Sequence, residues 1–466
     1  MNSSIKEQLK NKNFNGMNIT VVGLGISGMA AASFLIRHGA NVFVSDNKST
    51  SELEQNLEIL HKKGNFAFEA GEHTANIYSD KDLIVISPGV PPDLSFFEMA
   101  KLKHIPIINE VEFASYFIDS NKIIGITGTN GKTTVANLLH RILKNAGKRS
   151  NLCGNVGNPL IDFVDKTSDY FVVELSSFQL ETISEFKAHI GVILNLADDH
   201  IEYHKTFEKY AAAKEKLFSN MDAADFALIN NDDEYLKNAR IATKAEIVSY
   251  STEQDRAHRF YLNEKNIMFD DKILIDTNEL NLYGRHNMVN IIAALEISAL
   301  LDVDIMSAAD TVKSFKGLPH RLEHVANANG FEIINDSKST NPHSLEAALQ
   351  SFDRPLVLIA GGKDKGISFS GISSQGKRNV KYAVLFGEAK ARMREELDFK
   401  SSSMAADLDE AVDRALAHTQ KGDVLLFSPG CSSYDMFENY KERGRKFKEI
   451  VLKKLKHAIR DKRNFI

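Results

Sequence analysis

The sequence predicts an α/β protein with several domains, each built around a parallel sheet. At 466 residues the chain is too long for one core, since a domain usually holds about 100–200 residues. Its 43% hydrophobic and 26% charged residues are average for globular proteins and argue against disorder or a coiled coil. Short apolar segments alternate with helical ones, a pattern typical of parallel sheets with right-handed crossovers. We therefore expect three α/β domains, over residues 1–111, 112–317 and 318–466.

The composition also excludes several classes of protein. The 57 Lys and Arg and the 62 Asp and Glu leave a net charge of −5, so no global charge favours nucleic acid as a partner. The two cysteines, Cys153 and Cys431, are too few for a disulfide framework and suit a reducing compartment. The N-terminus carries no apolar signal core, and no run of about 18 apolar residues could span a membrane. We expect a cytoplasmic monomer.

The first domain is predicted to be Rossmann-like. We expect parallel strands at residues 18–22, 41–45 and 82–86. The first of them leads into Gly23-x-Gly25-x-x-Gly28 and an alanine-rich helix, and Asp46 ends the second. This spacing fits the dinucleotide-binding fingerprint. Alone it is equally compatible with a nicotinamide or flavin cofactor, another nucleotide, or a bare tight turn.

The second domain contains the strongest motif. A predicted strand at residues 123–127 leads into a loop and then a helix with apolar residues at 3.6-residue spacing. The loop consists of Gly128, Thr129, Asn130, Gly131, Lys132, Thr133 and Thr134. A glycine-rich turn at a helix start presents backbone N–H groups to an anion. Lys132 offers a charge to phosphates and Thr133 a hydroxyl to Mg²⁺. We expect a P-loop-type mononucleotide-binding domain, although two residues rather than four separate the glycines.

Acidic and histidine residues follow two further strands of this domain. Glu174 ends the strand predicted at 170–174, and Asp198, Asp199 and His200 come after the one at 190–195. Ligands of open α/β sheets bind at the carboxyl ends of the strands, so these side chains are expected near the loop as metal ligands. Residues 246–283 show short alternating runs, which predict a few antiparallel strands at the margin of the domain.

The third domain is predicted to be another Rossmann-like parallel sheet. We expect its strands at residues 332–335, 355–360, 382–386 and 424–428. Polar loops at 335–341 and 361–366 follow two of these strands and are suited to ligands. The last 26 residues carry 11 Lys and Arg but 3 Asp and Glu. Their apolar positions form one helical face: Phe447, Val451, Leu455, Ala458 and Ile459. We expect a helix packed on its own domain; binding to a membrane surface is the alternative.

Motifs in all three domains resemble those of one enzyme family. The segment GITGTNGKTT at 125–134 resembles the ATP loop of the Mur ligases and of the related folylpolyglutamate synthases. Four further segments narrow the resemblance to the branch of the Mur ligases that adds D-glutamate: LSSFQLE at 175–181, LPHRLE at 318–323, NDSK at 335–338, and SP at 428–429 with SS at 432–433. They occur in the order found in the family, so the resemblance covers nearly the whole chain.

The resemblance implies a reaction and its participants. D-glutamate would be joined to UDP-N-acetylmuramoyl-L-alanine through an acyl phosphate, with ATP converted to ADP and phosphate, in cytoplasmic peptidoglycan precursor synthesis. Two Mg²⁺ ions would take part, one held by Thr133 and Glu174 and the other by His200 and Lys214, the latter carbamylated. The implied catalytic residues are Lys132, Glu174, His200 and Lys214.

The resemblance also assigns binding residues to each substrate. The UDP substrate would contact Ile26, Ser27, Asp46, Ser87, Pro88, Gly89, Asn155 and His200. ATP would contact residues 128–134 together with Asn287, Asn290, His320, Arg321 and Asp336. D-glutamate would contact Thr340, Lys365, Ser433, Tyr434 and Tyr440.

Other functions remain to be weighed against this one. A dinucleotide-dependent oxidoreductase would use the first glycine loop but leaves Lys132 and Glu174 without a role. A ligase for another amino acid, or a folate-modifying enzyme, is disfavoured by the LSSFQ segment and by the lack of an Asp-Asn-Pro-Arg motif. A nucleotide switch without ligase activity would hydrolyse ATP with no acceptor amino acid.

Overall fold

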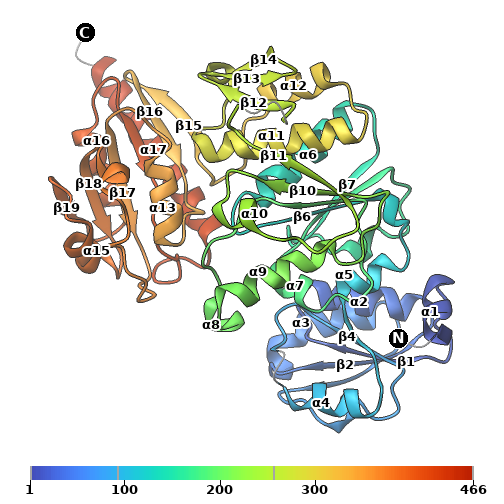
Figure 1. The fold of residues 1–466 in the computed structure, drawn as a ribbon. Coiled ribbons are helices and arrows are strands. Elements are labelled where there is room, and N and C mark those ends of the chain that lie inside the picture. The colour runs from blue at the N-terminus through green and yellow to red at the C-terminus, as the bar shows by residue number, and fades with distance from the viewer. Residues whose placement is uncertain (1–2, 92–93, 255–257, 464–466) are drawn as a thin grey trace. The chain divides into compact units, whose positions relative to one another are not determined.

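The computed structural model describes residues 3–91, 94–254 and 258–463. The chain divides into two compact units (Figure 1). Unit 1 comprises residues 1–274 and 290–311, and unit 2 comprises residues 275–289 and 312–466. Among the described residues, no helix is both long and apolar enough to cross a membrane.

The first sheet of unit 1 is five-stranded and parallel, as expected. Its strands run in the order β3-β2-β1-β4-β5 and comprise β1 (Asn18–Val22), β2 (Asn41–Asp46), β3 (Ala67–Ala70), β4 (Leu83–Ile86) and β5 (Ile107–Asn109). The helices of this region are α1 (Ser3–Lys10), α2 (Ile26–Arg37), α3 (Thr50–His61), α4 (Ser95–Leu102) and α5 (Glu110–Ser115). Strands β2 and β3 lie on one side of β1, and β4 and β5 lie on the other, so the strand order reverses between β1 and β4. The carboxyl ends of these two strands therefore form the edge at which open α/β sheets bind ligands.

The second sheet of unit 1 is six-stranded and also parallel. Its order is β11-β10-β9-β6-β8-β7, with β6 (Ile123–Thr127), β7 (Ser150–Gly154), β8 (Tyr170–Glu174), β9 (Ile190–Ile193), β10 (Phe226–Asn230) and β11 (Glu246–Tyr250). Its shorter helices are α7 (Ser177–Glu181), α8 (Ile201–His204), α9 (Phe207–Glu215) and α10 (Glu234–Asn238). The longer helices are α6 (Lys132–Asn145), which lies in unit 1, and α11 (Arg285–Leu300) and α12 (Ile305–Ser314), each of which has residues in both units.

The margin of this region differs in part from the expectation. A separate small sheet is formed by β12 (Phe260–Asn263), β13 (Asn266–Phe269) and β14 (Lys272–Asp276), and β12 pairs with β13 in antiparallel fashion as expected. The expectation was wrong for β11, which extends the main sheet parallel to β10. Alternation of apolar and polar residues is typical of a half-exposed edge strand, whether it is parallel or antiparallel. The sequence pattern therefore could not distinguish the two orientations.

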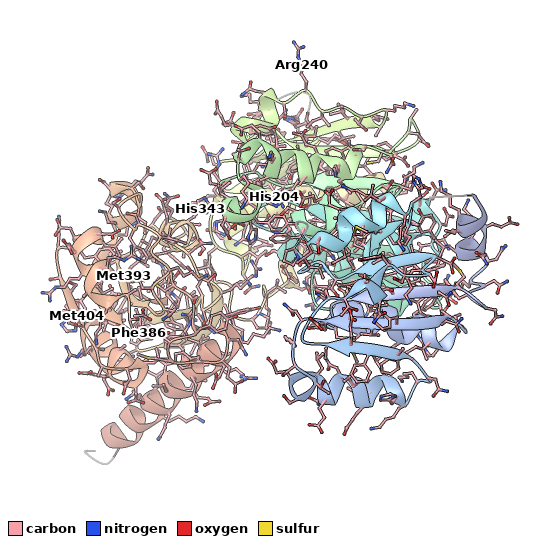
Figure 2. All side chains as sticks on the ribbon, turned by 90° about the horizontal axis from the view of Figure 1, so that it is seen from below. His204, Arg240, His343, Phe386, Met393 and Met404 are labelled. Carbon is pink, nitrogen blue, oxygen red and sulfur yellow. The ribbon has the colours of Figure 1, made fainter. Side chains whose placement is uncertain are left out.

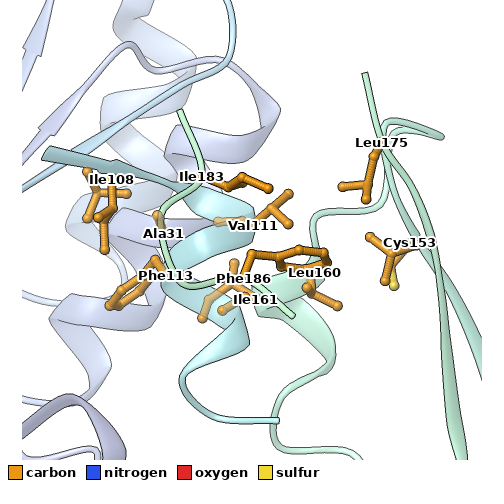
Figure 3. Close-up of a cluster of buried hydrophobic side chains, with 14 of the residues drawn as sticks. Ala31, Ile108, Val111, Phe113, Cys153, Leu160, Ile161, Leu175, Ile183 and Phe186 are labelled. Carbon is orange, nitrogen blue, oxygen red and sulfur yellow. The ribbon is translucent and has the colours of Figure 1, made fainter. Parts of the chain in front are cut away.

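One hydrophobic core joins the two sheets of unit 1. Figure 3 shows Phe113 and Val111 of α5 close to Leu160, Ile161 and Phe186 of the second sheet's region. Polar bonds cross the same boundary. The carboxylate of Glu112, whose side chain is fully buried, accepts hydrogen bonds from the backbone N–H groups of residues 184, 185 and 186 at 3.1, 2.7 and 2.8 Å.

Unit 2 contains a mixed sheet, so the expectation of an all-parallel sheet was wrong. The order is β15-β16-β20-β17-β18-β19, with β15 (Glu323–Ala328), β16 (Phe331–Asn335), β17 (Leu356–Gly361), β18 (Val380–Phe386), β19 (Ser402–Met404) and β20 (Val424–Phe427). Five strands are parallel, but β15 and β16 form an antiparallel hairpin. Asn329 and Gly330 turn the hairpin with φ of 49° and 81°, and Asn-Gly is the typical pair for such a turn.

Helices α13 (Pro342–Leu349), α14 (Ser374–Lys377), α15 (Lys390–Leu397), α16 (Leu408–His418) and α17 (Tyr440–Arg463) complete unit 2. The expected packing of the basic terminal helix is confirmed. Phe447 and Val451 of α17 are buried in the core on one face of the mixed sheet, and Leu455 packs against it. The side chains of Ala458 and Ile459 lie outside the described residues.

Candidate active site

The glycine-rich loop lies at the centre of the second sheet. It follows β6, which pairs with β8 on one side and β9 on the other. Gly131 has a φ of 85° and precedes the first turn of α6, where a Cβ would lie only 2.3 Å from Oδ1 of Asn290. The left-handed backbone favours glycine at this position, and a side chain here would also displace the amide of Asn290.

Asn195, which the sequence analysis did not select, supports the loop from β9. Its side-chain Oδ1 accepts a hydrogen bond from the backbone N–H of Asn130 at 2.8 Å, and its Nδ2 donates to the Asn130 carbonyl at 3.1 Å. Its own carbonyl accepts from the backbone N–H of Thr129 at 2.9 Å. These bonds fix the loop before any nucleotide binds. The sequence signal that could have identified Asn195 is its place at the end of the strand predicted at residues 190–195.

Lys132 is the first residue of α6, and its side chain turns back over the loop. The Nζ atom donates to the carbonyls of Gly128 at 2.7 Å and Thr129 at 2.9 Å. The ammonium group therefore lies where the loop would receive phosphate groups.

Lys214 of α9 is brought to the same corner, with only 2% of the residue exposed. Its Nζ atom lies 3.0 Å from the Gly128 carbonyl and 3.3 Å from Oγ1 of Thr127, and 4.8 Å from the ring centroid of Tyr210. Burial, and secondly the charge of Lys132, hold the pKa of Lys214 well below its ordinary value. A lowered pKa favours the neutral amine, which is the form that can react with carbon dioxide.

Glu174 ends β8 beside the start of the loop, since it pairs with Ile126 of β6. The residue is 2% exposed. Its Oε1 accepts a hydrogen bond from Nδ2 of Asn155 at 2.7 Å, whereas its Oε2 is buried without a hydrogen-bond partner. A buried carboxylate oxygen with no donor is suited to a divalent cation. The residues present therefore fit the expected Mg²⁺.

His200 occupies a more exposed position at the start of α8. It adopts a left-handed backbone with a φ of 53°, and its ring lies 4.9 Å from that of Phe178. Its Nε2 is 3.6 Å from Oδ2 of Asp199. Within the described part of the chain, no group of three or more His, Cys, Asp or Glu side chains could hold a metal ion. The assignment of His200 and carbamylated Lys214 to a second Mg²⁺ stays a prediction.

A second histidine of this segment, His204, was not selected from the sequence. It is buried among the side chains of unit 1 (Figure 2). Its Nε2 lies 3.0 Å from Oγ of Ser177, which begins α7, and its Nδ1 has no partner. Burial lowers its pKa, so the neutral ring helps to tie α8 to the turn that follows Glu174.

The first sheet brings the predicted UDP-binding residues to the edge between β1 and β4. Ser87 donates from Oγ to the carbonyl of Gly23 at 2.7 Å. Asp46 accepts through Oδ2 from the backbone N–H of Leu24 at 2.6 Å, so this carboxylate holds the glycine loop. The side chain of Ile26 is exposed at 67%, Ser27 is half-buried, and Pro88 and Gly89 line the adjacent turn. Asn155 belongs to the other sheet, where it contacts Glu174.

The residues assigned to adenine-nucleotide binding are divided between the units. Asn290 belongs to unit 1, and Asn287, which donates to the carbonyl of Tyr283 at 2.7 Å, belongs to unit 2. In unit 2 the Nδ1 of His320 lies 3.0 Å from Nδ2 of Asn335.

Asp336 is enclosed in unit 2 beside the half-buried Arg321. Its carboxylate accepts from Oγ of Ser428 at 2.8 Å and from the backbone N–H of Leu322 at 3.1 Å. Burial raises the pKa of Asp336 to about 7. The carboxylate therefore ties the residue after Arg321 to the end of β20.

The residues assigned to D-glutamate lie on three loops at the carboxyl edge of the mixed sheet. Thr340 and Lys365 line one small pocket. Ser433 is buried after β20, and Tyr434 beside it is exposed. Tyr440 lies beneath the ammonium group of Lys338, 4.3 Å from its ring centroid, rather than among the residues that line the pocket.

Comparison with known proteins assigns each region to one family. Three family models match: a Mur ligase MurD-like N-terminal domain over residues 17–109, a Mur ligase middle domain over 126–298, and a Mur ligase glutamate ligase domain over 320–431. The boundaries expected at residues 111 and 317 stay predictions.

Curated relatives match along almost the whole chain. A UDP-N-acetylmuramoylalanine--D-glutamate ligase of Koribacter versatilis is 40% identical over 444 residues, covering 94% of this chain and 98% of the relative. The enzyme of the same name from Clostridioides difficile is 37% identical with the same coverage.

Solved structures share the fold. The UDP-N-acetylmuramate-alanine ligase MurC of Thermotoga maritima has a TM-score of 0.59 at 19% identity, covering 94% of this chain and all of that one. MurF of Acinetobacter baumannii has a TM-score of 0.57 at 18% identity, covering 81% of this chain and 87% of that one.

Proposed function

The chain belongs to the Mur ligase family, and we propose that it joins D-glutamate to UDP-N-acetylmuramoyl-L-alanine at the expense of ATP. The observation that carries this proposal is the corner beside the glycine loop. Lys132, the buried amine of Lys214 and the unpartnered oxygen of Glu174 all lie around one glycine-rich turn. The named relatives supply the identity of the amino acid and of the UDP substrate.

The reaction requires activation of a carboxylate. The oxygen of a free carboxylate is too poor a leaving group for an amine to displace at neutral pH. Transfer of the γ-phosphoryl group from ATP to the alanine carboxylate gives an acyl phosphate and ADP. The amine of D-glutamate then attacks the carbonyl carbon, the carbon–oxygen bond to phosphate breaks, and the amine loses a proton. The products are the amide, ADP and phosphate.

Residues of the chain position and neutralise the reacting groups. Phosphoryl transfer needs little covalent chemistry from a protein beyond positioning and charge neutralisation. Backbone N–H groups of the loop receive the ATP phosphates, and Lys132 exchanges its bonds to the loop carbonyls for bonds to phosphate oxygens. Thr133 and Glu174 would hold one Mg²⁺, and His200 with carbamylated Lys214 a second. When bound, Mg²⁺ neutralises the negative charge of the phosphoryl group being transferred.

The setting of this reaction follows from its substrates. ATP and a UDP-linked precursor are both made in the cytoplasm, so we place the enzyme there, in the synthesis of peptidoglycan precursors. We propose that it acts as a monomer, because both halves of the assigned residue set are encoded in one chain.

Phosphate release in the presence of a panel of amino acids tests the function. We expect release to require ATP, Mg²⁺, the UDP-muramoyl substrate and D-glutamate together. L-glutamate, D-aspartate and meso-diaminopimelate serve as competing acceptors, and mass spectrometry identifies the product. Equal turnover with L-glutamate, or phosphate release without the muramoyl substrate, would contradict the proposal. A spectroscopic signal from bound nicotinamide would instead favour the oxidoreductase.

Lys365 is expected to recognise a carboxylate of D-glutamate. The Lys365→Ala variant should have a KM for D-glutamate raised at least about tenfold, because a charge-assisted hydrogen bond is lost. The KM for ATP should change far less. Initial rates at varied D-glutamate and varied ATP measure both constants, with Lys400→Ala, another exposed lysine of unit 2, as the matched control. A selective rise in the KM for ATP would place Lys365 at the nucleotide instead.

A further inference from the structure

Arg443 occupies an unusual position for an arginine. It lies in the first turn of α17 and is fully buried, and it is the largest of the fully buried side chains that the structure describes. In the sequence it is one of many basic residues of an amphipathic terminal helix, where a solvent-exposed side chain is the normal expectation. Its burial therefore calls for a physical explanation.

The guanidinium group bonds to two loops at once. Nε lies 3.1 Å from Oγ of Ser337, and Nη2 donates to the carbonyl of Ser337 at 2.8 Å. Nη1 donates to the carbonyls of Cys431 and Ser432 at 2.9 and 3.1 Å. Ser337 follows β16, and the other two residues follow β20. The planar fork of the guanidinium group thus fixes the distance between two separate loops.

A third loop packs against the same group. Gly362 follows β17, and a Cβ at this position would lie 3.0 Å from Nη1 of Arg443 and 2.4 Å from the carbonyl oxygen of Ser432. The next residue, Lys363, donates its backbone N–H to that carbonyl at 2.9 Å. Three strand-end loops of the mixed sheet, those after β16, β17 and β20, therefore meet at Arg443.

The bonding partners show that Arg443 does not serve as one half of an ion pair. All the acceptors named above are carbonyl or hydroxyl oxygens, and no described carboxylate lies within ion-pair distance of the guanidinium group. Burial lowers the pKa of Arg443 to about 10, so the group still carries its charge near pH 7. The negative charges of Asp435 and Asp336 act on the guanidinium group from beyond ion-pair distance. A buried charge with no directly bonded counter-ion is costly to a fold, so we attribute the contribution of Arg443 to the geometry that it imposes.

We propose that Arg443 is the positioning residue that aligns the three loops for recognition of D-glutamate. Each loop carries a residue assigned to that substrate within three positions of Arg443's contacts: Thr340 on the first, Lys365 on the second and Ser433 on the third. D-glutamate presents two carboxylates, and donors on separate loops must be held to within about 0.5 Å to bind both. This inference rests on the proposed function.

The Arg443→Lys variant provides the central test. Lysine retains a positive charge but has one nitrogen in place of the three that bond to the loops. We expect the KM for D-glutamate to rise at least about tenfold, while the KM for ATP and for the UDP substrate stay within about twofold. Arg414→Lys is the matched control, since Arg414 is an exposed arginine of α16 in the same unit, bonded to Glu410, and should leave all three constants unchanged.

Two further measurements separate positioning from general stabilisation. Ser337→Ala removes one hydrogen-bond acceptor of Arg443 and leaves the buried charge in place. It should also raise the KM for D-glutamate, but by a smaller factor than Arg443→Lys does. Added ethylguanidinium should partly restore the low KM in Arg443→Ala. A folded Arg443→Lys enzyme with a lower melting temperature but an unchanged KM for D-glutamate would overturn the proposal.

Hydrogen exchange distinguishes a failure of this inference from a failure of the proposed function. If the unaltered enzyme shows no phosphate release with D-glutamate, the function is wrong, but the loops can still be examined. Arg443→Lys should then show faster exchange of backbone amides at residues 337–340 and 430–434 than the unaltered protein, with no change in unit 1. Unchanged exchange at both segments would show that Arg443 does not position them.

Discussion

Replacement of Lys132 by alanine is expected to abolish phosphate release. Lys132 is the cation of the glycine loop, and its ammonium group lies within 3 Å of two loop carbonyls, where phosphate oxygens would be received. Preorganised charges of this kind typically contribute a factor of about 10²–10³ to kcat. We expect a loss at the upper end of that range or beyond, measured as phosphate release at saturating substrates.

A second lysine of α6 and the binding of the UDP substrate serve as controls for this variant. Lys144→Ala, at the exposed far end of α6, should retain full activity. The melting temperature of Lys132→Ala should stay near that of the unaltered protein, and calorimetric binding of the UDP substrate should persist, because most of the residues assigned to that substrate lie on the first sheet. A near-normal kcat for Lys132→Ala would remove the phosphate-binding assignment of the loop.

Lys214→Ala is expected to lose most activity and to recover part of it with added formate or acetate. Burial holds the pKa of Lys214 well below its ordinary value, which favours the neutral amine from which a carbamate forms. An ammonium group there would repel Mg²⁺, whereas a carbamate would provide a carboxylate ligand. A short carboxylate that enters the space left by the side chain would replace that ligand.

The pH and carbon dioxide dependence provide independent measurements for Lys214. Carbamate forms only from the neutral amine, so acidification that protonates Lys214 should reduce activity, and removal of dissolved carbon dioxide should do the same. In ¹³C NMR with labelled bicarbonate, a carbamate signal should appear in the unaltered protein and disappear in Lys214→Ala. Lys209→Ala, an exposed lysine of the same helix, should retain the signal. An unmodified Lys214 in fully active enzyme would contradict the assignment.

The site could be predicted from sequence wherever a residue directly follows a buried strand. Gly128 follows β6 and Glu174 ends β8, and the carboxyl ends of adjacent parallel strands necessarily meet at one edge. Lys214 comes from a helix, and only the family resemblance selected it. Its burial is a tertiary property, produced by the packing of α9 against the loop, and the sequence around it shows an ordinary helical lysine.

Other features depended on contacts that no local pattern encodes. Arg443 acts through backbone atoms of loops that are distant in sequence, so its spacing has no periodicity to detect. The antiparallel strand β15 has a local signal, the Asn329-Gly330 pair, which favours a hairpin. Hydrophobic alternation alone could not show whether β15 and β16 form an antiparallel hairpin or run parallel with a crossover between them.

The three hydrogen bonds that the Glu112 carboxylate accepts also determine how unit 1 should denature. They cross from the first sheet's region to residues 184–186, and the hydrophobic core is continuous across the same boundary. Opening that boundary would exchange these three hydrogen bonds for bonds to water and would expose the apolar side chains of the shared core. Neither region can lose its structure without destabilising the other. The regions that carry the UDP-binding and ATP-binding residues should therefore melt together in one cooperative transition, with a calorimetric enthalpy that belongs to both.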